Sequence, residues 1–148
     1  MTNTNTLQSF RDKWEKNMNA FYAEALREGS DTQHWIIGRN GFGSLVELKN
    51  YLAATKRILD AGCGNGRVTA LLRMLAPEHT EIVGIDLVGA DVARENFKDI
   101  SLTHFETRDL LGDLSGLGSF DFIYRQEVLH HTTDPERAFR NVSSLLAP

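Results

Sequence analysis

The feature of this 148-residue chain that most constrains its fold is a glycine-rich turn between two apolar segments. Residues 57–61 form a short apolar run typical of a buried strand, and residues 68–75 carry apolar side chains at helical spacing. Gly-Cys-Gly-Asn-Gly, residues 62–66, stands between them. A strand that turns directly into a helix needs glycine where the backbone takes a positive φ or lies against a ligand. The turn is therefore either a tight connection or one wall of a binding site, with the helix N-terminus facing an anion.

Alternating strand and helix patterns surround this turn. Further strands are predicted at residues 81–86, 102–107 and 120–124, and a short helix at residues 90–98. A last helix has Asp134 as its N-cap, Pro in its first turn and apolar side chains as far as Leu146. This alternation predicts an α/β fold with a doubly wound, mostly parallel sheet.

The N-terminal part of the chain is predicted to be mainly helical. Apolar side chains recur every three or four positions over residues 7–25, which predicts an amphipathic helix. A second helix is expected to begin at residues 44–47, where Ser and Glu have the spacing of a capping box. Residues 30–43 are glycine-rich and are predicted to be irregular. Trp35 and Phe42 in that segment are candidates for a lid over a pocket.

Composition excludes several classes of protein. The net charge of −4 argues against a nucleic-acid partner, because such proteins usually carry a basic surface. No run approaches the ~18–20 apolar residues that a membrane span needs, and the first residues lack the pattern of a secretory signal. The one cysteine, Cys63, cannot form an internal disulfide, which fits a reducing compartment. We therefore predict a cytoplasmic protein with no membrane span.

Two acidic residues strengthen the case for a binding site. Asp86 ends the second predicted strand, where a carboxylate can accept both hydroxyls of a ribose or, alternatively, cap local N–H groups. Asp109 follows the third predicted strand in a comparable place. The carboxyl ends of parallel strands meet at one edge of the sheet, so we expect a pocket there. The third glycine of a dinucleotide-binding fingerprint would fall at Arg67, which disfavours a nicotinamide cofactor.

The motifs resemble those of class I S-adenosylmethionine-dependent methyltransferases, especially those acting on small molecules and on glycan or lipid precursors. The resemblance rests on residues 60–66 (DAGCGNG) and on residues 120–135, including FDFIY and VLHHT. It implies that S-adenosyl-L-methionine is the cofactor and that ten residues bind it. These are Asp60, Gly62, Cys63, Gly64, Asp86, Leu87, Asp109, Leu110, Arg125 and Gln126.

The resemblance also assigns these residues to the two ends of the cofactor. The glycine loop would pass close to the methionine moiety, with Asp60 seating its amino group and Arg125 and Gln126 beside it. Asp86 would hold the ribose hydroxyls and Asp109 the adenine amino group, while the leucine that follows each aspartate would lie against the adenine. The chemistry agrees, because a diol and an amino group are donors and carboxylates are acceptors.

Residues 127–131 offer candidates for a catalytic base. His130 could take a proton from an oxygen or nitrogen nucleophile, since an imidazole titrates near pH ~6.5. His131 and Glu127 are rivals, and a packing role for the histidines is the alternative. Methyl transfer can also proceed without a base, because positioning supplies much of the acceleration. No second pair of ligands stands at a recognisable spacing, so no metal site is predicted.

The chain departs from the family in its number of strands. The family sheet has seven strands in the order 3-2-1-4-5-7-6, and this sequence supplies four, in the Rossmann-like order 3-2-1-4. Residues 1–55 are expected to form a helical cap or lid and residues 56–148 an incomplete cofactor-binding domain. The fourth strand, residues 120–124, is expected to have an open apolar edge through which the protein could self-associate.

Three functions follow from these patterns. The first is methyl transfer to a small-molecule acceptor, including a glycan or lipid precursor. The second is a non-catalytic binding or assembly role that retains the fold. The third, which Arg67 disfavours, is a nicotinamide-dependent oxidoreductase.

Overall fold

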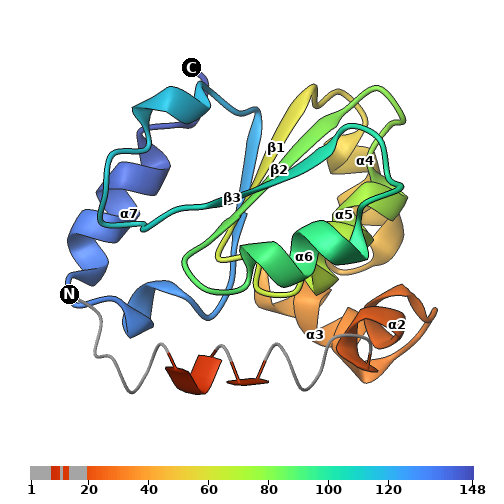
Figure 1. Cartoon of the computed structure of the whole chain (residues 1–148). Helices are drawn as coiled ribbons and strands as arrows, with labels where there is room; N and C mark the ends of the chain where they lie inside the picture. Colours follow the sequence, from red (N-terminus) through yellow and green to blue (C-terminus); the bar gives the residue numbers. More distant parts are fainter. Residues whose placement is uncertain (1–7, 11, 14–19) are drawn as a thin grey trace.

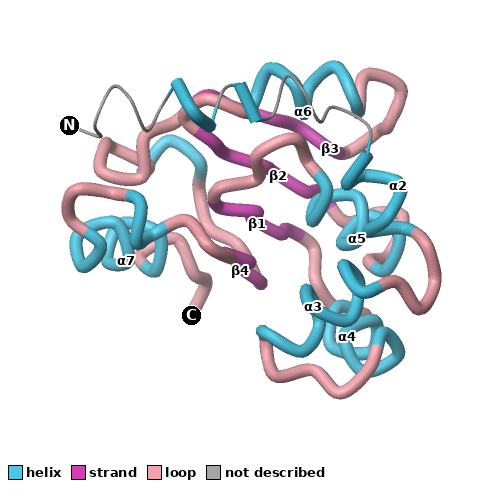
Figure 2. The backbone as a smooth tube through the Cα atoms, turned by 90° about the horizontal axis from the view of Figure 1, so that it is seen from below, coloured by secondary structure: helices cyan, strands magenta, loops and turns pink. Residues whose placement is uncertain are grey.

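Four parallel strands form the centre of the computed structural model, which describes residues 8–10, 12–13 and 20–148 (Figure 1). They are β1 (Arg57–Ala61), β2 (Glu81–Asp86), β3 (Thr103–Thr107) and β4 (Phe122–Arg125). Their order is β3-β2-β1-β4, as Figure 2 shows. Each neighbouring pair is parallel. The predicted fold class and strand order are confirmed.

Helices cover both faces of this sheet. They are α2 (Ala20–Leu26), α3 (Asp31–Arg39), α4 (Leu45–Leu52), α5 (Arg67–Leu75), α6 (Ala90–Asn96) and α7 (Pro135–Ser143), with short 3-10 turns η1 (Ser115–Leu117) and η2 (Leu129–His131). In Figure 1, α7 lies on one side of the strands and α4 and α5 on the other. Among the described residues, no helix is long and apolar enough to cross a membrane.

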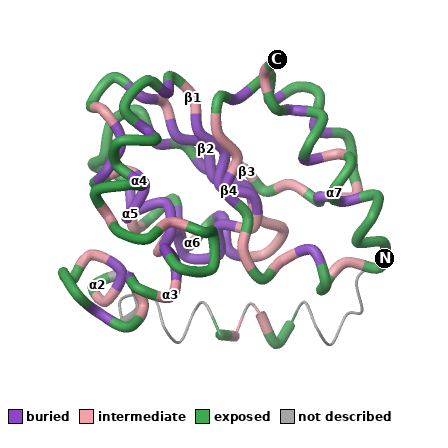
Figure 3. Tube along the Cα trace, turned by 180° about the vertical axis from the view of Figure 1, so that it is seen from behind, coloured by how far each residue is buried: buried purple, intermediate pink, exposed green. Residues whose placement is uncertain are grey.

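Apolar side chains of β1 and β2 fill two clusters, one on each face, and Phe105 of β3 belongs to a third cluster with residues of α6. Ile58 and Ile82 pack with residues of α3, α4 and α5, including Ile36 and Leu71. The adjacent residues Leu59 and Val83 face the opposite way, and their cluster includes Ala138 and Val142 of α7. Figure 3 shows the resulting buried sheet between helices with exposed outer surfaces. Burial of both faces explains why β1 and β2 appear in the sequence as continuous apolar runs.

The prediction that residues 30–43 are irregular is wrong, because residues 31–39 form α3. The Ser30 side chain accepts a hydrogen bond from the Gln33 backbone N–H at 3.1 Å, and the Gln33 amide oxygen accepts from the Gly29 N–H at 3.0 Å. The arrangement resembles a capping box of the S-x-x-Q form, except that Gln33 accepts from Gly29, the residue before the N-cap, and not from Ser30 itself. The pattern is present in the sequence, but the glycines that follow it obscure the helix.

The other N-terminal predictions agree with the part of the chain that the structure describes. α4 begins at the predicted capping box, where Ser44 accepts from the Glu47 N–H at 3.1 Å and Glu47 accepts from the Gly43 N–H at 2.7 Å. The helix predicted over residues 7–25 is seen as helical residues 8–10 and 12–13 and as α2. Leu7, Trp14 and Met18 of its apolar face lie outside the described residues.

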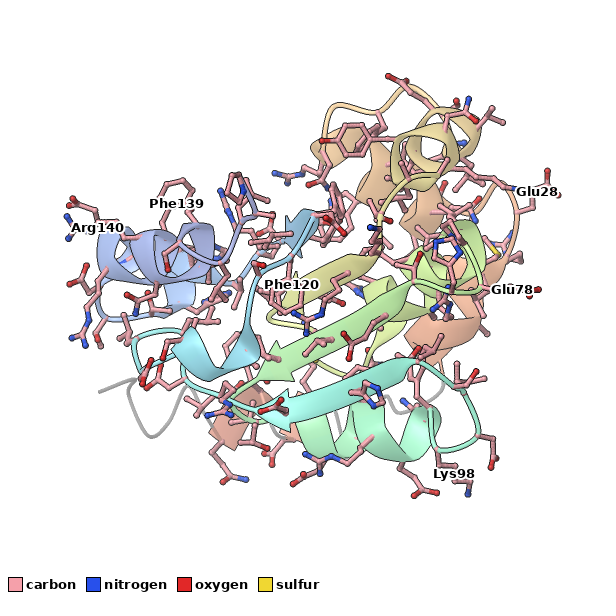
Figure 4. All side chains as sticks on the ribbon, turned by 90° about the horizontal axis from the view of Figure 1, so that it is seen from above. Glu28, Glu78, Lys98, Phe120, Phe139 and Arg140 are labelled. Carbon is pink, nitrogen blue, oxygen red and sulfur yellow. The ribbon has the colours of Figure 1, made fainter. Side chains whose placement is uncertain are left out.

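The edge of β4 differs from the expectation at its first residue. Phe120 lies before β4, its N–H donates to the Leu145 carbonyl, and its carbonyl accepts from the Ala147 N–H, both at 2.8 Å. α7 accordingly ends at Ser143, and the predicted extension of that helix to Leu146 is wrong. In Figure 4, Phe120 lies near the sheet, whereas Phe139 of α7, half-exposed, lies at the periphery. Self-association through the remaining edge of β4 stays a prediction.

Asp121 joins the beginning of β4 to the beginning of β1. Its Oδ2 accepts hydrogen bonds from the N–H groups of Arg57 (2.8 Å) and Lys56 (2.7 Å), and these bonds lower the pKa of the Asp121 carboxyl. We expect Asp121→Ala to lower the melting temperature at pH 7 by about 2–4 °C, because two solvent-exposed hydrogen bonds together contribute about as much as one typical hydrogen bond in a domain of this size.

The pH dependence of this loss provides a second measurement. Because the folded-state pKa of Asp121 is depressed, its stabilisation is present above the unfolded-state pKa of about 3.9 and is lost as the pH falls through the folded value. The difference in melting temperature should therefore vanish in acid. Glu136→Gln, in an exposed pair with Arg140, is the control that should change little. A difference that persists in acid would contradict the assignment.

Candidate functional site

A cavity of about 380 Å³ lies where the loops after the strands meet. Its walls come from the glycine loop after β1 and from the loops that follow β2, β3 and β4. Seven of the ten predicted cofactor residues line it, namely Gly62, Cys63, Asp86, Leu87, Asp109, Leu110 and Gln126. The structure thus brings together residues that span 64 positions of the chain, from 62 to 126, in one site.

The other three predicted residues do not line the cavity. Asp60 is buried at the end of β1, and its Oδ2 accepts a hydrogen bond from the Thr69 hydroxyl at 2.6 Å. Gly64 lies within the loop, and its N–H donates to Asp86 Oδ2 at 3.0 Å. The exposed Arg125 guanidinium lies over the Phe139 ring of α7, 5.9 Å from its centroid. Gly64 thus bonds a residue of the wall, Asp86, and Asp60 is bonded to α5, whereas the Arg125 side chain points toward α7.

The glycine loop has the backbone geometry that the sequence predicts. Gly62, Gly64 and Gly66 have φ values of 87°, 54° and 88°, which side-chain-bearing residues rarely adopt. A Cβ at Gly62 would come within 2.6 Å of Val128, and one at Gly66 within 2.7 Å of Phe97. Two of the glycines are therefore required by packing within the protein as well as by the turn.

Asp86 binds the backbone of its own neighbourhood. Oδ2 accepts from Gly64, and Oδ1 accepts from the N–H groups of Val88 (2.9 Å) and Gly89 (2.7 Å). Asp109 Oδ1 likewise accepts from the Leu111 N–H at 2.9 Å. The capping role weighed for Asp86 in the sequence is therefore present. A carboxylate offers about four lone-pair sites, so acceptor capacity remains on both residues for a ligand at the cavity.

The cavity also contains residues that the sequence analysis did not place there. Arg67 and Trp35 both line it, with the Arg67 guanidinium 5.2 Å from the centroid of the Trp35 ring. Phe10 and Lys13, from the N-terminal helical residues, form a further part of the wall. Trp35 was predicted as a lid residue and lies at the cavity, whereas Phe42 instead packs on Tyr51 with ring centroids 5.6 Å apart. Arg67 directly follows the glycine loop in the sequence, and this position could have predicted that it lies at the cavity.

The two histidines occupy different surroundings. His131 lines the cavity, and its ring lies edge-on to Phe10 with centroids 4.8 Å apart. Burial lowers the pKa of His131, and the neighbouring His130 and Lys13 lower it further. His130 is largely exposed and is not a wall residue, and its Nε2 lies 3.9 Å from a carboxylate oxygen of Glu127. Within the described residues, no group of three or more His, Cys, Asp or Glu side chains forms a candidate metal site.

Comparison with known proteins identifies the family. The sequence model of a methyltransferase domain matches residues 32–148, most of the chain. The chain belongs to the class I S-adenosylmethionine-dependent methyltransferase family. This confirms the predicted family and the predicted cofactor, S-adenosyl-L-methionine. The result favours methyl transfer over the nicotinamide hypothesis.

Curated relatives and solved structures agree with this methyltransferase assignment. Juvenile hormone acid O-methyltransferase of Bombyx mori is 35% identical over 98 residues, which cover 61% of this chain and 34% of the relative. Ubiquinone biosynthesis O-methyltransferase of Chromobacterium violaceum is 29% identical over 106 residues, which cover 64% of this chain and 41% of the relative. This methyltransferase domain thus spans less than half the length of either relative.

The solved structures support the fold. The N-methyltransferase NodS of Bradyrhizobium japonicum, in complex with S-adenosyl-L-homocysteine, has a TM-score of 0.65 and 23% identity over 94% of this chain and 68% of that one. The N-terminal domain of EvdMO1, with S-adenosylhomocysteine bound, has a TM-score of 0.63 and 22% identity. The match covers 99% of this chain and 63% of that one. Both are similar to this methyltransferase domain in fold.

The buried Asp60 carboxyl generates a pH prediction. Burial raises the pKa of Asp60 to about 7, opposed by the Thr69 hydrogen bond and assisted by the charge of Asp86. Because the folded-state pKa is above the unfolded value of about 3.9, this group's contribution to stability is present below pH ~4 and is lost as the pH rises through about 7. Asp60→Asn should remove that decline.

Melting temperatures of the ligand-free protein between pH 4.5 and pH 8 test this expectation. The wild-type value should fall relative to that of Asp60→Asn as the pH rises. Asp91→Asn, at an exposed position of α6, should keep the wild-type profile. Parallel profiles for the wild type and Asp60→Asn would show that Asp60 is ionised in the folded protein throughout this range.

Proposed function

We propose that this domain binds S-adenosyl-L-methionine in the cavity and transfers its methyl group to an oxygen or nitrogen of a small-molecule acceptor, including a glycan or lipid precursor. The observation that carries the proposal is the convergence of the glycine loop and two strand-end carboxylates, Asp86 and Asp109, on one cavity in a methyltransferase fold. Bound S-adenosylmethionine supplies an electrophilic methyl group on a sulfonium. The protein's part is to hold, orient and desolvate the reacting groups.

The adenosine end would be held by acceptor-only groups. Asp86, already fixed by three backbone N–H groups, would accept from the ribose hydroxyls with its remaining lone pairs. Asp109 would accept from the adenine amino group in the same way. Leu87 and Leu110 line the cavity beside these carboxylates and supply apolar surface for the adenine. The cavity therefore offers both polar and apolar contacts that match an adenosine.

The acceptor end would lie near His131 and the aromatic wall. Phe10, whose ring contacts His131, gives that part of the cavity apolar surface suited to a small organic acceptor. The depressed pKa of His131 keeps its imidazole neutral at pH 7, so it can accept the proton of an acceptor hydroxyl. The names of the Bombyx and Chromobacterium relatives describe O-methyltransferases, which supports an oxygen nucleophile as the first class to test.

The first experiment separates the three functions. Calorimetric titration of the protein with S-adenosyl-L-homocysteine and with NAD should show binding of the former alone. Transfer of labelled methyl groups to panels of carboxylic acids, phenols and glycan or lipid precursors then tests turnover. Binding without transfer to any acceptor class would favour the non-catalytic role.

A cytoplasmic location, proposed from the single cysteine, is testable by fractionation of the source cells.

Asp86→Ala should weaken binding of S-adenosyl-L-homocysteine by ~1–3 kcal/mol, because the ribose hydroxyls lose a charged acceptor. Titration calorimetry measures the change. Asp113→Ala is the matched control, since Asp113 also caps a backbone N–H, that of Ser115 at 2.9 Å, but does not line the cavity. Equal affinities of the Asp86 variant and the wild type would refute the assignment of Asp86 to the ribose.

His131→Ala should lower turnover by ~10²–10⁴ while the affinity for S-adenosyl-L-homocysteine changes little, because a general base acts on the acceptor. His130→Ala is the informative comparison, since His130 was the first candidate and does not line the cavity. A larger loss of turnover in the His130 variant than in the His131 variant would return the base to His130. Unchanged turnover in both would show that positioning alone suffices.

A further inference from the structure

One polar atom at the cavity has no partner. The side-chain nitrogen Nε2 of Gln126 is buried and makes no hydrogen bond, and it alone among the buried side-chain N and O atoms of the described residues has this property. Gln126 also lines the cavity. Leaving a buried donor unpaired is unfavourable, so such an atom at a binding site points to a ligand that accepts from it.

The other end of the same amide is occupied. The Tyr124 hydroxyl donates a hydrogen bond to Gln126 Oε1. Tyr124 is 2% exposed on β4, and burial, with the charge of Asp60, raises the pKa of its phenol well above the ordinary value. The hydroxyl therefore keeps its proton and remains a donor. With Oε1 held by that proton, the NH2 group is the end of Gln126 that is available to a ligand.

Tyr124 is itself oriented from the far side of the core. Asn40, the C-cap of α3, uses its Nδ2 to donate to the Tyr124 hydroxyl oxygen at 2.9 Å and to the Ile36 carbonyl at 2.8 Å. The hydroxyl oxygen accepts from Asn40, and its own proton has two acceptors within reach, Gln126 Oε1 and the Ile36 carbonyl at 3.4 Å. The contact with Gln126 is the shorter of the two, so the proton is directed to Gln126. The three side chains form a directional series of hydrogen bonds, in which each bond polarises the next.

The ligand group that fits this donor is an anionic oxygen. We propose that Tyr124 is a positioning residue: held by Asn40, it orients the Gln126 amide so that Nε2 donates to the carboxylate of the methionine end of the bound cofactor. The inference rests on the proposed function and adds to it Tyr124, a residue that acts on the cofactor through Gln126. The guanidinium of Arg67, stacked on Trp35 at the same cavity, supplies positive charge for the same carboxylate.

A pair of ligands separates this role from a structural one. S-adenosyl-L-homocysteine carries the amino-acid end, and 5′-methylthioadenosine shares the adenosine and the sulfur but lacks that end. Tyr124→Phe keeps the buried ring and removes only the hydroxyl. We expect it to lower the affinity for S-adenosyl-L-homocysteine about 5- to 30-fold and to leave the affinity for 5′-methylthioadenosine unchanged within about twofold, as measured by calorimetry.

A double-mutant cycle tests the coupling. Gln126→Leu should produce the same ligand-selective loss, and adding Tyr124→Phe to it should cause little further loss, because both changes remove one interaction. Asn40→Ala, at an exposed position, should give a smaller loss in the same direction and serves if the Tyr124 variant folds poorly. Tyr51→Phe, an exposed tyrosine of α4, is the matched control and should bind both ligands as the wild type does.

Each contrary result has a distinct meaning. Equal losses for the two ligands in Tyr124→Phe would show that Tyr124 only supports the fold, and unchanged binding of both would show that it does not position Gln126. Either result overturns the inference while the cofactor assignment stands. Failure of the wild-type protein to bind S-adenosyl-L-homocysteine would overturn the proposed function and the inference together.

Discussion

The backbone of the glycine loop is the constraint on which the rest of the structure depends. The N–H groups of Gly62 and Cys63 both donate to the Ile85 carbonyl, at 2.7 and 3.0 Å, and that of Gly64 donates to Asp86. These bonds fix the end of β1 against the end of β2 and set the direction in which α5 leaves. The three positive φ values favour glycine at these positions, because residues with a side chain rarely adopt them. This local geometry determines both the part of the cavity wall that the glycine loop forms and the point at which α5 begins.

Features set by local sequence were predictable. β1 and β2 have the predicted bounds, because strands buried on both faces are continuous apolar runs that end at glycine or aspartate. The parallel arrangement then places the ends of these strands at one edge, which brought Asp86 and Asp109 to the same cavity as expected. The family resemblance supplied the cofactor, which neither composition nor spacing could specify.

Features set by contacts between distant segments were not predictable. Asp60, Gly62 and Gly64 belong to the same sequence motif, yet only the three-dimensional packing shows that Gly62 lines the cavity and that Asp60 and Gly64 do not. The direction of the Arg125 side chain depends on where Phe139 of α7 lies. α3 is an intermediate case, since its capping box was present in the sequence, but three nearby glycines outweighed it in the prediction.

The hydrogen bonds that hold the two parts of the cavity differ in how far apart in the sequence their partners lie. Asp86 and Asp109, which we propose to hold the adenosine, accept hydrogen bonds from backbone N–H groups two or three residues ahead, and Asp86 accepts from Gly64 as well. These loops are fixed by the protein itself, so little entropy would be lost there when a ligand binds. The Gln126 amide is instead bonded to Tyr124, which in turn is bonded to Asn40, 84 positions away from Tyr124 in the sequence. If Gln126 holds the amino-acid end of the cofactor as proposed, changes at Asn40, the C-cap of α3, would alter recognition of that end and leave the adenosine end undisturbed. The helical segment before the sheet is thus a structural part of the cavity, since it supplies Trp35 to the wall and Asn40 to the hydrogen bonds behind Gln126.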